Sequence, residues 1–226
     1  MTIEISLAAD LSGLIIGAVE LVGVKVQSSS DSLRAWSDEI ARQAVAEAEL
    51  PSSEALRQQV RQMLRHGKFK ASGRSKPAQE YLLRCAVQDQ SLPAINGPVD
   101  ILNSVSLCCG LPISLLSIRK SSSLLHIRHG RAGEAYIFNA AGQELNVEDL
   151  IVVCDQTQTP DRPIGSPIKD SMAGKIESSD DHQIAIVYGP ATAADRVNQA
   201  KNMLIDRFAQ YDVGQGRTVE IVPSSK

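Results

Sequence analysis

The sequence predicts an α+β fold in which helices pack on a mixed or antiparallel sheet. Residues 14–26 are rich in β-branched side chains, which favour a strand, whereas apolar residues from Leu33 to Ala48 recur at helical spacing. A short apolar run at 184–188 adds a later strand, and no internal repeat is visible. Helices and strands in this order are typical of an α+β protein.

The length and composition are those of one globular unit. The chain has 226 residues, of which 43% are hydrophobic and 22% charged, so it can bury a sizeable core without a disulfide or a metal. We therefore expect residues 1–226 to form a single domain. Only 4% of the residues are aromatic and the net charge is −3, which argues against a base-stacking platform and against a general nucleic-acid binder.

The first half of the chain is predicted to contain strands followed by helices. The apolar stretch from Leu11 to Val26 is interrupted by Glu20 and follows no basic segment. It therefore fits a pair of buried strands better than a signal peptide or a membrane span. Helices are predicted from about Leu33 to Ala48 and from Pro51 to about Gly67, where glycine favours a helix end. A loop at 68–80 and a helix at 80–87 follow.

The second half is predicted to contain two further helices and several short strands. A helix at 99–109 ends at Gly110, and apolar residues along 197–208 mark another helix, with Thr192 as its N-cap. Residues 156–182 contain three prolines and many polar side chains, so we expect a long surface segment there. Strands are expected at about 123–128, 134–138, 150–154, 184–188 and 218–222.

Cysteine and histidine spacing gives no metal signature. The four cysteines form no CxxC pair, and His126 and His129 are not spaced as metal ligands, so we expect no metal and no cofactor. Free cysteines indicate a reducing, cytoplasmic setting. The adjacent Cys108 and Cys109 are interpreted as buried thiols, with redox chemistry as the alternative. His66 lies at a predicted helix end, where it can act as a cap.

Charge is distributed unevenly, and residues 55–79 contain no acid. Three arginines of this stretch recur at every fourth residue, which places them on one face of the second predicted helix. This basic stretch fits either a surface that contacts phosphates or an ordinary solvated helix face. Its seven cations are Arg57, Arg61, Arg65, Lys68, Lys70, Arg74 and Lys76.

Three polar side chains recur at helical spacing near the start of the helix predicted at 99–109. They are Asn96, Asp100 and Asn103, and apolar residues surround them. Buried polar groups need hydrogen-bond partners. The sequence therefore predicts either a structural network that fixes the start of this helix or a polar pocket that recognises a small ligand.

Four motifs follow one another in a fixed order between residues 91 and 155. They are Asn-Gly-Pro-Val-Asp-Ile-Leu-Asn at 96–103, Gly-Leu-Pro-Ile-Ser at 110–114, Leu-His-Ile-Arg at 125–128 followed by Gly133-Glu134, and Glu-Asp-Leu-Ile-Val-Val-Cys-Asp at 148–155. In this order and spacing they resemble the B3/B4 domain, the editing module of the bacterial phenylalanyl-tRNA synthetase β chain. The resemblance extends over about residues 65–210, and we expect residues 1–64 to belong to the same unit.

The resemblance implies a pocket between the sheet and the helix that carries Asn103. In the synthetase this pocket hydrolyses the ester of a tRNA that carries the wrong amino acid. Asn103 matches a pocket asparagine, whereas Leu102, Ser114 and Val187 stand where the synthetase has threonine, histidine and glutamate. The resemblance places Asn96, Asp100, Asn103, Ser114, Arg128 and Glu134 in the ligand pocket.

Two functions follow from the resemblance. The first is a trans-editing aminoacyl-tRNA deacylase, in which Asn103 orients the amino acid or water, Ser114 is a hydrogen-bonding neighbour, and the basic stretch 55–79 contacts tRNA. The alternative is a non-catalytic module that binds tRNA or an amino acid, which the changed pocket positions favour. A different small-molecule enzyme on the same fold is a third possibility, because a fold does not fix a function.

Overall fold

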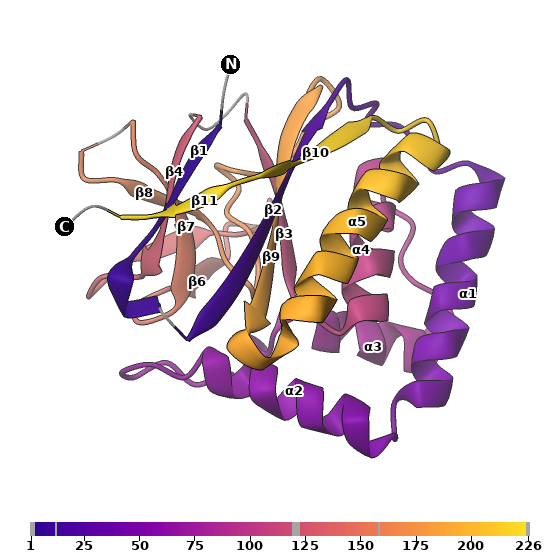
Figure 1. Cartoon of the computed structure of the whole chain (residues 1–226), viewed down its shortest axis with the longest axis horizontal. Helices are drawn as coiled ribbons and strands as arrows, with labels where there is room; N and C mark the ends of the chain where they lie inside the picture. Colours follow the sequence, from indigo (N-terminus) through magenta and orange to yellow (C-terminus); the bar gives the residue numbers. More distant parts are fainter. Residues whose placement is uncertain (1–2, 12, 119–122, 158, 225–226) are drawn as a thin grey trace.

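Helices cover one face of a four-stranded sheet, and a five-stranded sheet packs against its other face (Figure 1). The computed structural model describes residues 3–11, 13–118, 123–157 and 159–224, except for the side chains of Pro51 and Arg74. The α+β class and the mixed and antiparallel sheets predicted from the sequence are confirmed. None of the described helices is long and apolar enough to cross a membrane.

The four-stranded sheet forms the middle layer and is antiparallel throughout. Its order is β10 (Gln215–Val219), β2 (Leu14–Val22), β9 (His182–Pro190) and β3 (Ile113–Ser117). Strand side chains alternate between faces, so Ile184, Ile186 and Tyr188 of β9 face the five-stranded sheet while Ala185 and Val187 face the helices. Two separate apolar clusters therefore lie on the two sides of this sheet.

The five-stranded sheet is mixed. Its order is β11 (Ile221–Pro223), β1 (Glu4–Leu7), β4 (Leu124–His129), β7 (Ile151–Asp155) and β8 (Arg162–Gly165). Strand β1 runs parallel to both β11 and β4, and the other pairs are antiparallel. A short hairpin of β5 (Ala135–Ile137) and β6 (Glu144–Asn146) follows β4 in the chain.

Local signals at the helix ends explain where several helices begin and stop. The Ser30 hydroxyl accepts a hydrogen bond from the Leu33 amide at the start of α1, and the Asn96 side chain accepts one from the Val99 amide at the start of α4. Gly110 ends α4 with a left-handed backbone (φ 68°). The helices are α1 (Asp31–Glu47), α2 (Pro51–Met63), α3 (Ala78–Asp89), α4 (Gly97–Cys109) and α5 (Ala194–Gln210).

Several boundaries differ from the sequence-based expectation. The stretch 11–26 contains one strand, β2, and not a pair. Residues 156–182 are not a surface segment throughout, because β8 pairs with β7 and Ile164, Ser166 and Ile168 are buried. The Thr192 hydroxyl lies 2.9 Å from the Gln59 side-chain oxygen and does not cap α5. Strands β1, β3, β6 and β8 were not predicted.

Candidate functional site

The residues predicted for one ligand pocket lie in three separate places. At the start of α4, the buried Asp100 carboxylate accepts hydrogen bonds from the Ser29 hydroxyl (2.6 Å) and the Ile95 amide (2.9 Å). The Arg34 guanidinium of α1 lies 3.3 Å from the same carboxylate. With Asn96 as the helix cap, these contacts form the structural network that the sequence allowed as one of two alternatives.

Asn103 lies further along α4 and is partly buried. Its neighbour Leu102 is 6% exposed and belongs to the apolar cluster between the helices and the four-stranded sheet. Val187, on β9, is fully buried in the same cluster. Two of the positions that the resemblance matches to polar pocket residues are therefore part of an apolar core here.

Ser114 lies on the opposite side of the four-stranded sheet from Asn103. On β3, Ile113 and Leu115 face the helices, so Ser114 faces the five-stranded sheet. There its hydroxyl lies 2.9 Å from the Tyr188 hydroxyl and donates to the Ser166 carbonyl oxygen at 3.2 Å. The sheet thus separates Ser114 from α4, and the two residues cannot line one pocket.

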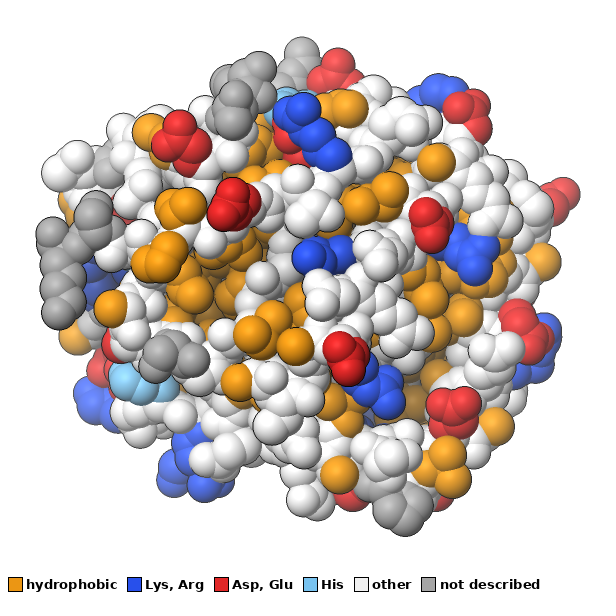
Figure 2. All heavy atoms as spheres, in the orientation of Figure 1, with side chains coloured by type: hydrophobic (Ala, Val, Ile, Leu, Met, Phe, Trp, Pro, Cys, Tyr) orange, Lys and Arg blue, Asp and Glu red, His pale blue; other side chains and the backbone are white. Residues whose placement is uncertain are grey.

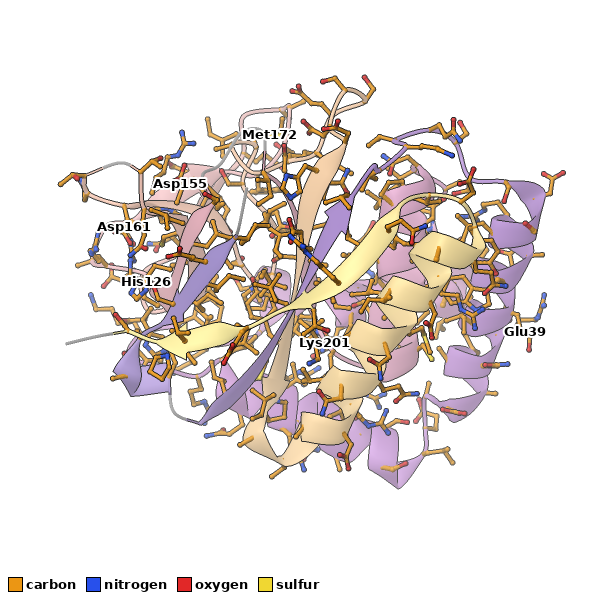
Figure 3. All side chains as sticks on the ribbon, turned by 45° about the horizontal axis from the view of Figure 1, so that its top comes forward. Glu39, His126, Asp155, Asp161, Met172 and Lys201 are labelled. Atoms are coloured by element: carbon orange, nitrogen blue, oxygen red, sulfur yellow. The ribbon has the colours of Figure 1, made fainter. Side chains whose placement is uncertain are left out.

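Arg128 and Glu134 form a third group, at the far end of the five-stranded sheet. The buried Arg128 guanidinium donates to both Glu134 oxygens at 2.8 Å and to Asp161 at 3.0 Å. Figure 3 shows Asp161 at one end of the molecule and Glu39, on α1, at the other. This bidentate network fixes the turn after β4 and lies far from the start of α4.

The basic stretch 55–79 is only partly free to contact phosphates. The side chains of Arg57, Arg61 and Lys68 pair with Glu54, Glu80 and Glu148. Arg65, Lys70 and Lys76 are exposed and make no ion pair with any described residue, whereas the side chain of Arg74 is outside the described part. Basic side chains gather at the lower left of Figure 2, where Figure 1 places the loop after α2, while both signs are interspersed over α5.

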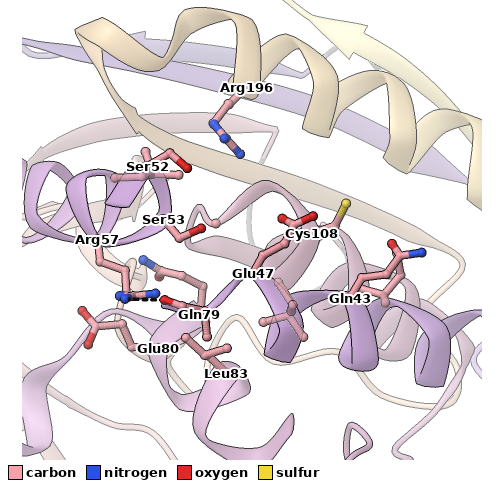
Figure 4. A pocket seen from close by; sticks show the side chains of 16 residues that line it. Gln43, Glu47, Ser52, Ser53, Arg57, Gln79, Glu80, Leu83, Cys108 and Arg196 are labelled. Atoms are coloured by element: carbon pink, nitrogen blue, oxygen red, sulfur yellow. Dashed lines mark hydrogen bonds between the residues drawn. The ribbon is translucent and has the colours of Figure 1, made fainter. Parts of the chain in front are cut away.

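A cavity of about 150 Å³ lies where all five long helices converge (Figure 4). This volume is close to that of a cavity that holds one benzene ring, so the pocket has room for a single amino acid but not for a nucleotide. Gly110 helps to shape it, because a Cβ at this position would lie 2.8 Å from the Leu56 side chain. Its polar lining residues include Glu47, Ser53, Arg57, Gln79, Cys108 and Arg196.

Gln79, in the first turn of α3, is the most informative residue of this pocket. Its side chain is 3% exposed, and neither its amide nitrogen nor its amide oxygen has a hydrogen-bond partner among the described residues. Leaving a buried polar group unpaired costs about 1–3 kcal/mol. A buried amide that lines a cavity without a partner therefore points to a polar ligand that would supply both an acceptor and a donor.

Charged groups of both signs surround Gln79. The Arg57 guanidinium donates to the Ala48 carbonyl oxygen at 2.8 Å and pairs with Glu54, which fixes it at the pocket wall. Glu47 and Arg196 lie at the exposed rim, on α1 and α5 (Figure 4). A zwitterionic ligand would find a carboxylate and two guanidinium groups within one small pocket.

Cys108 places a thiol in the same pocket. A hydrogen bond with Cys109 lowers the pKa of Cys108 to about 7, against the opposing effects of burial and of Glu47. Arg196 and Arg207 favour the thiolate further. The same hydrogen bond, together with burial, raises the pKa of Cys109, which is fully buried. The cysteine pair is therefore split into one buried thiol, as predicted, and one thiol that is ionised near neutral pH.

The sequence alone did not predict this pocket, although Arg57 and Cys108 were predicted to have other roles. The lining residues come from five helices, and none of them forms a local motif with another. The signal that was present is Gln79 itself, a polar residue on the apolar face of a helix beside Leu82 and Ala86. None of the six predicted ligand-pocket residues lines this cavity.

Comparisons with known proteins support the fold alone. No protein-family model and no curated protein matches the sequence. Among solved structures, the chain is similar to an N-terminal fragment of the phenylalanyl-tRNA synthetase β-subunit from Pyrococcus horikoshii, with a TM-score of 0.57 and 10% identity. The match covers 99% of this chain but 53% of that fragment, so this chain spans about half of its length. The chain thus adopts a fold similar to part of a tRNA-synthetase subunit.

Proposed function

We propose that this protein is a binding module that takes an amino-acid-sized group, free or attached to tRNA, into the pocket among its five helices. The observation that carries the proposal is the amide of Gln79, which has no hydrogen-bond partner among the described residues and lies at the wall of a cavity of about 150 Å³. An α-amino acid has a donor, an acceptor and two opposite charges, which match the amide, Glu47 and the two arginines.

The connection to tRNA rests on two further observations. The fold is similar to part of a phenylalanyl-tRNA synthetase β-subunit. In addition, the exposed cations Arg65, Lys70 and Lys76 lie on the segments that precede α3, where Gln79 begins to line the pocket. Exposed cations on the segment that connects two pocket-lining helices can hold a phosphate backbone while the pocket takes the terminal group.

Binding measurements separate the two parts of this proposal. Wild-type protein would be titrated with a panel of free amino acids and with tRNA, charged and uncharged. Gln79→Leu should abolish the preference for an amino acid or for charged over uncharged tRNA. Gln62→Leu, an exposed position on α2 outside the pocket, is the matched control and should bind as the wild type does. Equal binding by the two variants would overturn the assignment of the pocket.

Ester hydrolysis is a second candidate, and Cys108 is the observation that favours it. Its thiolate would attack the ester carbonyl carbon and form a thioester, while the departing tRNA oxygen takes a proton from water. Hydrolysis of the thioester would then release the amino acid and restore the thiolate. A deacylation time course with the wild type and Cys108→Ser tests this step. Release of the amino acid by the wild type that is lost in Cys108→Ser supports an editing hydrolase. Binding without release leaves the protein a binding module.

A further inference from the structure

Three side chains that are far apart in the sequence meet at the end of the five-stranded sheet where strands β1 and β4 finish. Asp10, His66 and His129 each place one oxygen or nitrogen atom so that all three atoms lie within 4.8 Å of one another. Spacing along the chain predicted no metal site, because these residues come from three different segments. Contacts outside the cluster hold each of these three residues in place.

His66 is held by a short hairpin at the end of α2. The His66 carbonyl oxygen accepts a hydrogen bond from the Phe69 amide (2.8 Å), and the Phe69 ring is buried in the core between the sheets. The Lys68 amide donates to the Asp149 carboxylate at 2.7 Å, and its ammonium group pairs with Glu148. The hairpin is thus anchored by an apolar residue and by two polar contacts to a distant segment.

His129 and Asp10 are fixed by the backbone of the sheet. His129 is the last residue of β4 and pairs with Ile151 of β7. Asp10 lies in the short 3-10 helix η1 (Ala9–Leu11), which follows β1. This turn is held on one side by the Ala8 amide, which donates to the Ile127 carbonyl oxygen of β4, and on the other by the buried Leu11 side chain. The Asp10 carboxylate and His129 Nδ1 are 2.8 Å apart. Each of the three residues therefore has a backbone position set by contacts outside the cluster.

The two imidazole rings are close enough to share a ligand. The His66 and His129 rings are stacked with centroids 3.7 Å apart and an angle of 8° between their planes. One nitrogen of His129 faces Asp10, and the cluster is open to solvent because Asp10 and His66 are exposed. Because the three ligand atoms already lie within 4.8 Å of one another, rotations of the exposed side chains would turn the two ring nitrogens and the carboxylate toward one shared ion.

We propose that Asp10, His66 and His129 form a site for a first-row divalent transition metal such as Zn²⁺. Two imidazole nitrogens and one carboxylate are a donor set that suits such ions. Mg²⁺ and Ca²⁺ require mostly oxygen ligands and are not expected to bind here. Three protein ligands at an exposed site leave coordination positions open to water or to an anionic group. This proposal is independent of the pocket among the helices.

Metal titration tests the site directly. Wild-type protein would be titrated with Co²⁺ in place of Zn²⁺, followed by visible absorption and by calorimetry. We expect binding of one ion, with absorption in the visible range that Zn²⁺ removes. His66→Ala and His129→Ala should each weaken binding by at least about tenfold, since changes to residues that merely support a ligand already cost that much.

His182→Gln is the matched control for this experiment. His182 lies in the four-stranded sheet and pairs with Glu20 at 2.8 Å. Among the described residues it has this one carboxylate partner and no stacked imidazole. This variant should bind Co²⁺ as the wild type does. In the wild type, added Mg²⁺ should not displace Co²⁺ from the site. Unchanged affinity in both His66→Ala and His129→Ala, with circular dichroism showing folded protein, would overturn the site, as would equal weakening in His182→Gln.

Discussion

The Ser114 hydroxyl of β3 lies 2.9 Å from the Tyr188 hydroxyl of β9, and both side chains are buried between the two sheets. Because Ser114 donates to the Ser166 carbonyl oxygen, its oxygen is available to accept from Tyr188. The residue that stands at a ligand-pocket position in the resemblance thus links β3 to the neighbouring strand β9 and to the segment that follows β8.

This relationship predicts that Ser114→Ala affects stability and not binding. The variant leaves the buried Tyr188 hydroxyl without an acceptor, so unfolding in urea should show a loss of about 1–3 kcal/mol. Binding of amino acids and of charged tRNA should be unchanged. In the double variant with Tyr188→Phe, part of the loss should be recovered, because the unpaired group is gone. Unchanged stability with lost binding would contradict the structural role.

Gln79→Leu should have the opposite effect on stability. The substitution removes a buried amide that has no partner among the described residues, and the leucine side chain adds apolar contacts with a similar volume. We expect the free energy of unfolding to rise by about 1 kcal/mol or more in the absence of ligand. Chemical denaturation of ligand-free protein measures this. A clear loss of stability would show that Gln79 has a structural partner and would weaken the ligand-pocket interpretation.

Asp170 should make the folded protein less stable as the pH rises, whereas an acid with a lowered pKa makes it more stable. Burial raises its pKa to about 6, although the Leu115 and Ser166 amides donate to its carboxylate. The folded state therefore binds this proton more tightly than the unfolded state, whose pKa is near 3.9. The contribution of Asp170 to stability should fall as the pH rises from about 4 to 6 and should stay constant above that range, with a total change of at most about 3 kcal/mol.

Asp170→Asn isolates this contribution, because asparagine does not titrate. The difference in unfolding free energy between the wild type and Asp170→Asn should shift against the wild type between about pH 4 and pH 6, measured by urea denaturation at each pH. A difference that is flat over this range, or that shifts in favour of the wild type, would mean that the folded protein does not raise the pKa of Asp170.

Cys108 should be the cysteine that alkylates first in native protein. Iodoacetamide reacts with thiolates, and with a pKa of about 7 the Cys108 thiol is about half ionised at neutral pH. The alkylation rate should reach half its maximum near pH 7, and an amino acid in the pocket should slow it. Mass spectrometry of digested protein identifies the modified residue, and Cys108→Ser is the control. A rate that continues to rise above pH 9 would contradict the lowered pKa.

Local patterns in the sequence were enough to predict most helices. Apolar residues at helical spacing marked α1, α2 and α5, while Gly110 marked the end of α4. These signals act within one or two turns, so they do not depend on the rest of the fold. Strands such as β1 and β8 escaped prediction because they are four residues long and acquire their partners from distant segments.

The sequence by itself determined the fold class, the helices and the acid-free stretch at 55–79, because periodicity, capping and charge are properties of neighbouring residues. Only the tertiary structure decided which of those residues are available for function. It paired Arg57 and Arg61 with acids, placed Gln79 at a cavity without a partner among the described residues, and brought Asp10 to His66 and His129. The physical reason is that burial, pairing and convergence depend on which distant segments pack together, which no local spacing records.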